Sequence, residues 1–540
     1  MKQAVILAGG KGTRLQERLN GLPKPLIDIC GQPLLGRQID LLKRYGYQEI
    51  LILVNHESEK IIRFCEEYAA PGISIQCIDD GLPLGTAGSV IAVWPKLAAS
   101  FLVMYGDTLL DVDLNRFEKF HHANHLADAS LFLHPNDHPA DSDLVEIAEG
   151  GRITAFKPYP HASDKFDANL VNAGLYYLNK ELLLDWIGNS KLLDFGKDIF
   201  PVALKKNYLL QGYVSPEYIK DCGTPKRLDK VCADFSTGKV GRSNLELPQK
   251  AVFLDRDGTL NELNGYINNP SQLSLLPRVG EAIGRLNRSN YLSILTTNQP
   301  VLARGECSVS ELKMIHNKLE SLLGGEGAYL DRIEYCPHHP DGGYAGEVAS
   351  LKIKCNCRKP AIGMISKVAD DWNIDLGASW LIGDSTADFL AAHDAGVKSI
   401  GVETGMAGLD GRYAISSNFT VPDIFSGVQF ILDAYPRILG ECRELVKKVD
   451  PSDWVLIGGL SRSGKSNFAQ CYKDALVARG ISAIIISVDS WLRVEADRTA
   501  GVLGRYDLDA LRFWVNNILK NTGGQALSVN HYDRKHKGPR

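Results

Sequence analysis

The sequence predicts an α/β protein of three successive domains whose sheets are mostly parallel. Three apolar stretches, residues 4–7, 251–254 and 454–457, have the composition of buried strands, and each leads into a glycine-rich or aspartate-rich loop. Helical and strand-like stretches alternate after each of them, which is the pattern of α/β domains. Ligands of such sheets bind at the carboxyl ends of the strands, where these three loops lie.

Length and composition agree with this organisation. A chain of 540 residues holds roughly three domains of ordinary size. We expect domains at 1–238, 248–440 and 452–540, with the polar stretch 236–244 as the first linker and a second join near 447–453. A hydrophobic content of 44% and a charged content of 23% are ordinary for a globular protein.

The net charge and the number of cysteines limit the partners and the compartment that we expect. The net charge of −4 gives no reason to expect a nucleic acid or an anionic membrane as partner, and no apolar run approaches the ~20 residues that span a bilayer. The N-terminus has the pattern of a strand that enters a glycine loop, not that of a signal peptide. Eleven cysteines in a chain of this length suit a reducing compartment, so we expect a cytoplasmic protein. The oligomeric state is not readable from these features.

The first loop carries a phosphate-binding pattern. Residues 9–15 read GGKGTRL, and Pro23-Lys24-Pro25 follows. Glycines let backbone N–H groups wrap a triphosphate, and Arg14 and Lys24 supply positive charge where pyrophosphate leaves. These residues resemble the signature of sugar-1-phosphate nucleotidyltransferases. Further motifs of that family follow in order up to about residue 235: GTAG at 85–88, Gly106-Asp107, Lys157-Pro158, Asn172-Ala173-Gly174, and Asp221 with Gly223-Thr224-Pro225.

The resemblance implies transfer of a nucleotidyl group from a nucleoside triphosphate to a sugar 1-phosphate. One departure concerns the lysine motif, because many relatives carry Glu where this chain has Phe156, so a sugar hydroxyl contact is either missing or supplied elsewhere. The implied residues are Gly9, Gly10, Gly12, Thr13, Gly85, Thr86 and Gly88 for the nucleotide, Arg14 and Lys24 for catalysis, Lys157, Asn172 and Gly174 for the sugar phosphate, and Asp107 and Asp221 for one Mg²⁺.

The second loop carries a carboxylate pair suited to phosphoryl transfer. Residues 255–259 read DRDGT, so Asp255 is placed to attack phosphorus, and Asp257 to protonate the leaving alkoxide and later activate water. The motif resembles the nucleophile motif of haloacid-dehalogenase (HAD)-type phosphatases, and three further motifs of that family follow in order. The resemblance implies Thr297 and Asn298 for the phosphoryl oxygens, Lys359 for charge stabilisation, Asp255, Asp257 and Asp384 (in GDSTAD at 383–388) for Mg²⁺, and Arg304 and Arg358 for a second phosphate of the substrate.

Between these motifs lies a C-x-H and C-x-C tetrad. Cys336, His338, Cys355 and Cys357 offer three thiols and one imidazole on two short loops, which is the ligand set of a closed structural zinc site. Tetrad and DxDGT motif together resemble the D-glycero-D-manno-heptose 1,7-bisphosphate phosphatases, with histidinol-phosphate phosphatases as close relatives. The adjacent His339 is interpreted as a bystander, and a structural zinc would fold the loop that positions Arg358 and Lys359.

The third loop is a phosphate-binding loop of the GxxxxGKS type at residues 459–466. Its implied nucleotide-binding residues are Gly459, Gly464, Lys465 and Ser466, with ATP as ligand and Ser466 on Mg²⁺. A second strand is expected at 483–488, before Asp489. This spacing and the later Tyr532-Asp533 resemble the uridine-kinase-like P-loop kinases. The match covers about residues 453–540, and relatives continue with a lid that closes on ATP, so kinase activity and a nucleotide-binding module without turnover both stay open.

The three parts predict one route for nucleotide-activated heptose, in which a C-terminal kinase would make heptose 1,7-bisphosphate from the 7-phosphate. The middle domain removes the 7-phosphate of heptose 1,7-bisphosphate, and the N-terminal domain couples the remaining 1-phosphate to a nucleotide. The resemblance of that domain to heptose-1-phosphate guanylyltransferases, together with the pathway, makes GTP the expected donor and GDP-heptose for surface polysaccharide (lipopolysaccharide) the expected product. The alternatives are a transferase for another hexose 1-phosphate, of mannose or glucose type, and a phosphatase for histidinol phosphate.

Overall fold

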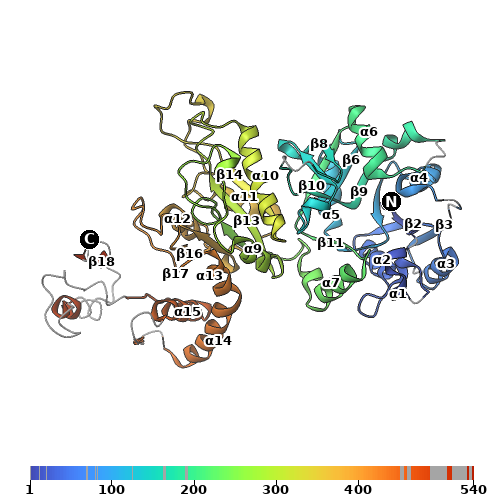
Figure 1. Cartoon of the computed structure of the whole chain (residues 1–540). Helices are drawn as coiled ribbons and strands as arrows, with labels where there is room; N and C mark the ends of the chain where they lie inside the picture. Colours follow the sequence, from blue (N-terminus) through green and yellow to red (C-terminus); the bar gives the residue numbers. More distant parts are fainter. Residues whose placement is uncertain are drawn as a thin grey trace. The chain divides into compact units, whose positions relative to one another are not determined.

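The computed structural model describes most of the chain (Figure 1). It divides into two units, Met1–Leu432 and Asp433–Arg540. Among the described residues, no helix is long and apolar enough to cross a membrane. The described residues are 2–10, 12–19, 21–68, 71–79, 81, 83–124, 126–161, 166–188, 192–450, 455–458, 464–486 and 507–513, with the short strands β18 (Tyr532–Asp533) and β19 (Gly538–Pro539).

A large mixed sheet forms the first part of unit 1 (Figure 1). Its main strands lie in the order β10–β6–β9–β4–β1–β2–β3, and the short strands β7 and β8 are attached at β9. The pairs β1–β2, β1–β4, β2–β3 and β6–β10 are parallel, whereas β9 runs antiparallel to β4 and β6. The bounds are β1 (Lys2–Leu7), β2 (Tyr47–Val54), β3 (Ser74–Asp79), β4 (Ser100–Tyr105), β6 (Ala129–His134), β7 (Leu144–Ile147), β8 (Ile153–Lys157), β9 (Val171–Asn179) and β10 (Leu210–Val214).

The first strand shows why this sheet is covered on both faces. Ala4 and Ile6 lie in the buried cluster of one face, and Val5 lies in that of the other face. Since successive side chains of a strand point to opposite faces, a strand that is apolar at every position needs helices on both sides. Helix α2 (Leu34–Arg44) contributes to the first cluster and α4 (Gly85–Ala92) to the second.

A separate two-stranded sheet joins distant parts of the sequence. Strand β5 (Thr108–Asp111) pairs with β11 (Tyr218–Asp221) in antiparallel register, with Asp221 opposite Thr108. The backbone N–H of Cys222 donates to the carbonyl of Asp107 at 2.8 Å. This pairing brings the end of β11 beside the loop that follows β4.

The polar stretch 236–244, predicted as a linker, is partly helical and packed. Helix α8 (Lys239–Arg242) buries Val240 in the cluster formed with the preceding helix α7 (Pro225–Ser236). The Asn244 side chain donates to the hydroxyl of Tyr45 at 2.9 Å. Apolar contact and a buried hydrogen bond therefore hold this stretch against the first sheet's helices.

A six-stranded sheet, parallel throughout, forms the second part of unit 1. The order β14–β13–β12–β15–β16–β17 reverses direction at β12. Ligands of parallel sheets bind at the carboxyl ends of the strands where the order reverses. The bounds are β12 (Lys250–Leu254), β13 (Tyr291–Asn298), β14 (Arg332–Cys336), β15 (Trp380–Gly383), β16 (Lys398–Val402) and β17 (Phe419–Val421).

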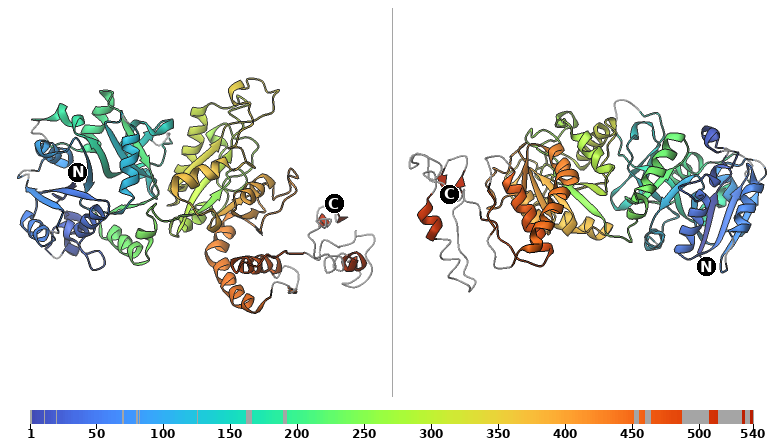
Figure 2. Two further views of the ribbon diagram at one scale, coloured as in Figure 1. Left: turned by 180° about the vertical axis from the view of Figure 1, so that it is seen from behind. Right: turned by 90° about the horizontal axis from the view of Figure 1, so that it is seen from below.

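Helices before and after these strands cover both faces, as the two further views show (Figure 2). Phe253 on β12 and Leu381 on β15 are fully buried against residues of α11 and α12. The bounds are α9 (Val279–Asn287), α10 (Val309–Gly325), α11 (Gly363–Trp372), α12 (Thr386–Asp394) and α13 (Ile424–Gln429).

In the described residues of unit 2, the two stretches that the sequence predicts as strands are not paired as strands. The described residues of those stretches, 455–457 and 483–486, have no strand pairing, and the side chains of Leu456 and Ile484 are 93% and 85% exposed. An apolar strand is stable only when neighbours pair with it and cover it, and no described strand does so here. The described residues include a helix pair, α14 (Tyr435–Leu445) and α15 (Lys465–Ala478). The Tyr435 hydroxyl joins the two helices by donating to Asp474 at 2.7 Å.

Candidate active sites and metal centre

A buried ion cluster forms at the carboxyl end of β12. The Lys359 ammonium donates to Asp255 at 2.7 Å, to Asp388 at 2.5 Å and to the carbonyl of Thr296 at 2.7 Å. Lys359 is only 5% exposed, and Asp388 1%. Burial lowers the pKa of Lys359, but Asp255 and Asp388 more than offset it, so the net shift is upward.

Three carboxylates of this cluster form a candidate cation site. Oxygens of Asp255, Asp384 and Asp388 all lie within 4.8 Å of one another. Burial raises the pKa of Asp255 to about 7 and that of Asp384 to about 8, because desolvation and neighbouring carboxylates disfavour the charged forms. Three carboxylates this close together offer the oxygen ligands that a hard divalent cation such as Mg²⁺ prefers.

Asp257, the predicted acid and base, has a different set of partners. Its side chain accepts two bonds from Arg256 Nη2, at 2.9 and 3.0 Å, and one from Gln299 at 3.1 Å. The three-carboxylate group contains Asp388 and not Asp257, whose role as a Mg²⁺ ligand stays a prediction. Arg256, fully buried, therefore orients Asp257 as a bidentate partner.

The loop that carries Lys359 is bound to the end of β13. The Asn298 side chain donates to the carbonyl of Lys359 and accepts from its N–H, both at 3.0 Å. The neighbouring Thr297 hydroxyl accepts from Gln299 at 2.8 Å. The residues predicted to hold phosphoryl oxygens thus sit beside the lysine and the nucleophile.

The cysteine and histidine tetrad is assembled. Cys336 ends β14, His338 follows it, and Cys355 and Cys357 precede α11. Sγ atoms lie 3.2 to 3.6 Å apart, and His338 Nδ1 lies 3.3 Å from Cys357 Sγ. A tetrahedral ion with sulfur at ~2.3 Å needs ligand separations of about 3.7 Å, so the four atoms nearly form its corners. The adjacent His339 is not in this group.

The carboxylates of the first sheet's site meet where β5 and β11 pair. Lys24, 7% exposed, donates to Asp107 at 2.5 Å, and Arg227 donates to Asp221 at 2.8 and 3.1 Å. A Cβ on Gly223 would lie 2.7 Å from Asp221 Oδ1 and 3.5 Å from both Lys24 Nζ and Arg14 Nη2. Two carboxylates and three cations therefore lie together, with Arg14 in the turn η1 (Thr13–Leu15) that follows the β1 glycine loop.

The second glycine loop opens α4. Gly85 has a φ of +80°, and a Cβ there would lie 2.3 Å from the carbonyl oxygen of Leu193, so only glycine fits. The Thr86 hydroxyl donates to Asp194 at 2.8 Å, which fixes the loop against residues 193–195. Of the first glycine loop, residues 9, 10 and 12 are described.

The predicted sugar side lies on β8 and β9. Lys157 Nζ is 3.6 Å from Glu146 on the paired strand β7. Phe156 stacks on Phe200 at 6.1 Å between ring centroids, so this position serves packing instead of offering a carboxylate. The side chain of Asn172 accepts from the N–H of Gly174 at 3.1 Å.

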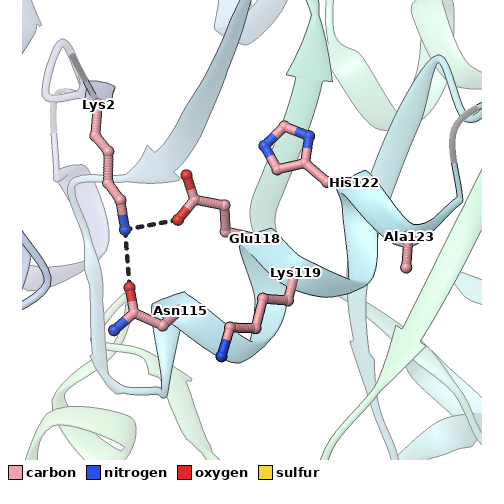
Figure 3. Close-up of a pocket in the computed structure, with 6 residues that line it drawn as sticks. All are labelled: Lys2, Asn115, Glu118, Lys119, His122 and Ala123. Carbon is pink, nitrogen blue, oxygen red and sulfur yellow. Dashed lines mark hydrogen bonds and ion pairs between the residues drawn. The ribbon is translucent and has the colours of Figure 1, made fainter.

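A surface pocket lies at the other end of β1 (Figure 3). Its lining includes Lys2, whose ammonium donates to Asn115 at 2.8 Å and pairs with Glu118 at 2.6 Å. Since Lys2 begins β1 and the glycine loop follows its carboxyl end, this pocket is not the predicted nucleotide site.

In unit 2 the structure places part of the third loop. Gly464, with a φ of +81°, caps α15, and Lys465 and Ser466 form its first turn. Gly459 and Asp489 lie outside the described residues.

Comparisons with known proteins divide the chain in the same way. A nucleotidyl transferase family model matches residues 3–237, and a HAD-hydrolase-like model matches residues 356–424. The D-glycero-beta-D-manno-heptose-1,7-bisphosphate 7-phosphatase of Haemophilus ducreyi is 43% identical over 161 residues, 29% of this chain and 86% of that protein.

Two further comparisons concern the N-terminal part. The probable mannose-1-phosphate guanylyltransferase 2 of Arabidopsis thaliana is 34% identical over 245 residues, 44% of this chain and 64% of that protein. The solved structure of HddC from Yersinia pseudotuberculosis has 27% identity and a TM-score of 0.38, covering 44% of this chain and 100% of that one.

Fold and matches together define a bifunctional enzyme, a nucleotidyltransferase joined to a HAD-type phosphatase. Through its middle part, the chain belongs to the D-glycero-D-manno-heptose-1,7-bisphosphate 7-phosphatase family.

Proposed function

We propose that this enzyme hydrolyses the 7-phosphate of D-glycero-D-manno-heptose 1,7-bisphosphate and then joins the heptose 1-phosphate to GMP from GTP. The observation that carries the proposal is the 43% identity to a heptose bisphosphate phosphatase, in a chain whose N-terminal part is a nucleotidyltransferase. The product of the first reaction is then the substrate of the second. The resemblance of that part to a guanylyltransferase supports GTP as the donor.

In the phosphatase reaction, Asp255 attacks phosphorus and forms an aspartyl-phosphate. Asp257, oriented by Arg256, protonates the leaving sugar oxygen and then removes a proton from the attacking water. Lys359 and the Thr297 hydroxyl stabilise the charge on the phosphoryl oxygens. Mg²⁺ held by Asp255, Asp384 and Asp388 would lower the electrostatic repulsion between the phosphate dianion and the Asp255 carboxylate.

The tetrad fits a zinc ion better than other metals. Three thiols and one imidazole at near-tetrahedral separations form a closed donor set, with no water-coordinating position required. The ion would tie the ends of β14 and of the loop before α11 together. Because Lys359 follows Cys357 by two residues, a bound ion would help to keep the lysine in its contact with Asp255, at 2.7 Å.

In the transferase reaction, the sugar 1-phosphate attacks the α-phosphorus of GTP. The β1 glycine loop binds the triphosphate, and Arg14 and Lys24 neutralise the departing pyrophosphate. Asp107 and Asp221, which are paired with Lys24 and Arg227, are the carboxylates that would hold Mg²⁺, and the cation would supply charge neutralisation for the phosphates.

One experiment separates the alternatives. Purified full-length chain is given Mg²⁺ and each anomer of heptose 1,7-bisphosphate, with or without GTP. Phosphate release followed by GTP-dependent pyrophosphate and GDP-heptose supports the proposal. Pyrophosphate release with mannose 1-phosphate but not with heptose 1-phosphate would favour the second candidate, a mannose-type transferase, which the Arabidopsis relative suggests. Hydrolysis of histidinol phosphate in preference to the bisphosphate would overturn the phosphatase assignment.

For unit 2 we propose a nucleotide-binding segment. The observation behind it is a glycine with positive φ that opens α15 directly before Lys465 and Ser466, the arrangement in which backbone N–H groups can surround phosphates. Calorimetric titration of the chain with ATP tests this, compared with a Lys465→Ala variant. ATP-dependent phosphorylation of heptose 7-phosphate would instead establish a kinase.

A further inference from the structure

Helix α10 of the phosphatase part carries a polar stripe beside its apolar one. The apolar stripe consists of the fully buried side chains Leu312, Ile315, Leu319 and Leu323. Lys313, Asn317 and Glu320 follow the spacing i, i+4, i+7, so they share a second stripe of the same helix. All three of these polar residues contact the transferase part of unit 1.

Glu146 on β7 lies between two lysines. Lys313 donates to its Oε1 at 2.7 Å and to the carbonyl of Ile147 at 3.3 Å, whereas Lys157 Nζ lies 3.6 Å from its Oε2. The hydrogen bond from Lys313 is the largest cause of the lowered pKa of Glu146, so this carboxylate is charged at neutral pH. A lysine of the phosphatase part and a lysine of the transferase part therefore share one carboxylate.

The next two turns of α10 bind the chain segment between β8 and β9. The Asn317 side chain donates to the carbonyl of Phe166 at 2.9 Å, and Glu320 accepts from the N–H of Asn169 at 3.1 Å. Asn317 and Asn169 are both buried. This segment links Lys157, at the end of β8, to Asn172 on β9, so α10 contacts the backbone between the two predicted sugar-phosphate residues.

The charge of Glu146 affects what Lys157 can bind. A carboxylate next to a lysine competes with a phosphate for the same ammonium group, because both are oxygen anions. Here the closer contact of Glu146 is with Lys313, and its contact with Lys157 is the longer one. Without Lys313, the carboxylate would have Lys157 as its remaining lysine partner.

We propose that Lys313, a residue of the phosphatase part, is a positioning residue of the transferase site: it binds Glu146, so that Lys157 keeps its charge for the phosphate of the sugar 1-phosphate. The polar stripe of α10 is then the surface through which the phosphatase part completes the sugar side of the transferase. This inference rests on the proposed transferase reaction and on the predicted role of Lys157. Lys313 itself does not touch the substrate.

The test measures GTP-dependent pyrophosphate release by the full chain while the concentration of heptose 1-phosphate is varied. In Lys313→Met we expect KM for heptose 1-phosphate to rise about threefold, which is the size of effect that a partly exposed ion pair produces. Both kcat and KM for GTP should stay within about 1.5-fold, because the change affects only the binding of the sugar phosphate.

A second substitution separates positioning by charge from a loosened interface. In the double variant Lys313→Met/Glu146→Gln the competing charge is gone, so KM should return to within about 1.5-fold of that of the unaltered chain. Lys313→Arg should keep the low KM, since arginine can also bind the carboxylate. Lys318→Met is the matched control, because this lysine lies on the same helix but donates to the Pro270 carbonyl, at 2.7 Å, within the phosphatase part. Its transferase kinetics should be unchanged.

Two results in the variants would overturn the inference. One is an unchanged KM for heptose 1-phosphate in Lys313→Met. The other is an increase that Glu146→Gln does not reverse, since that would reflect a disturbed interface and not a competing charge.

The unaltered chain separates this inference from the proposed function. If it releases pyrophosphate from GTP with neither heptose 1-phosphate nor mannose 1-phosphate, the transferase proposal fails and the inference fails with it. If it uses one of these sugars and the KM for that sugar is the same in Lys313→Met, the transferase proposal stands and the inference alone is wrong.

Discussion

Replacing Lys359 by methionine removes the ammonium group that three buried oxygens share. Methionine has a similar length and fills the same space, so the packing of the site is little changed. Asp255 and Asp388 lose the cation that binds both of them, at 2.7 and 2.5 Å. The carbonyl of Thr296 loses its donor as well.

The expected loss of stability follows from burial. All of these groups are more than nine-tenths buried, and breaking a buried ion pair by removing one partner costs about 3 to 5 kcal/mol. For a domain of this size that corresponds to a decrease in Tm of roughly 10 °C. Mg²⁺ should return part of it, because the cation would replace the missing charge between the carboxylates.

Thermal unfolding of the full-length chain in EDTA, and again with saturating Mg²⁺, measures both effects. Lys367→Met is the matched control, because this lysine lies in the same domain but forms an exposed pair with Glu334 that is worth at most about 1 kcal/mol. Phosphate release from the bisphosphate should fall about 10²- to 10³-fold in Lys359→Met and stay unchanged in Lys367→Met.

Two results would refute the reasoning. A Tm in EDTA within about 2 °C of the unaltered chain would show that the cluster does not depend on the lysine charge. A decrease in Tm that Mg²⁺ leaves untouched would show that Asp255 and Asp388 do not share the candidate cation site.

Three further predictions concern other parts of unit 1. Burial raises the pKa of Glu217 to about 7, so this side chain takes up a proton on folding. The free energy of unfolding should therefore decrease between about pH 4.5 and 7, by at most about 3 kcal/mol. Denaturant titrations at several pH values should show a flatter dependence in Glu217→Gln, and an equal slope in both proteins would contradict the prediction. Cys357→Ser should lose bound zinc, measured by elemental analysis, and lower phosphatase activity, whereas the exposed Cys30→Ser should change neither; full zinc occupancy in Cys357→Ser would argue against the tetrad. Gly85→Ala should abolish nucleotidyl transfer and leave phosphate release unchanged, because the new Cβ would meet the Leu193 carbonyl. Gly21 has a similar positive φ but no described neighbouring atom within 4 Å of an added Cβ, so Gly21→Ala should lower nucleotidyl transfer only slightly. An equal loss in both variants would point to backbone strain alone.

Several site residues could be predicted because local sequence is enough to place them. Asp255 follows an apolar strand and must lie at its carboxyl end, and the C-x-H and C-x-C spacings put two ligands on each of two loops. The nucleotidyltransferase motifs likewise recur in a fixed order along the chain.

Other residues of the site could not be found in this way. Asp388 binds Lys359 only because α12 packs beside β15, and the GDSTAD motif that contains it gave no sign of that contact. Arg256 and Gln299 stand next to predicted residues, yet their hold on Asp257 depends on side-chain directions that the order of residues does not reveal. The guanidinium of Arg304 lies against the rings of Tyr266 and Tyr344, and this contact joins three loops that are far apart in the sequence.

The strand predictions show the same division. Residues 251–254 were expected as a strand, and β12 contains them because β13 and β15 pair with it on both sides. Residues 454–457 have a similar apolar pattern, but their described part has no strand beside it and remains unpaired. Apolar composition makes a strand possible, and only pairing makes it stable.

The sequence by itself determined the fold class and the order of the two catalytic domains, and it predicted the chemistry of most reacting groups, since these depend on residue type, spacing and short-range geometry. Tertiary structure decided which carboxylates share Lys359, which cations converge at Gly223 and which tyrosine covers Arg304. Those contacts join residues far apart in the chain, and burial between them sets their charge and strength.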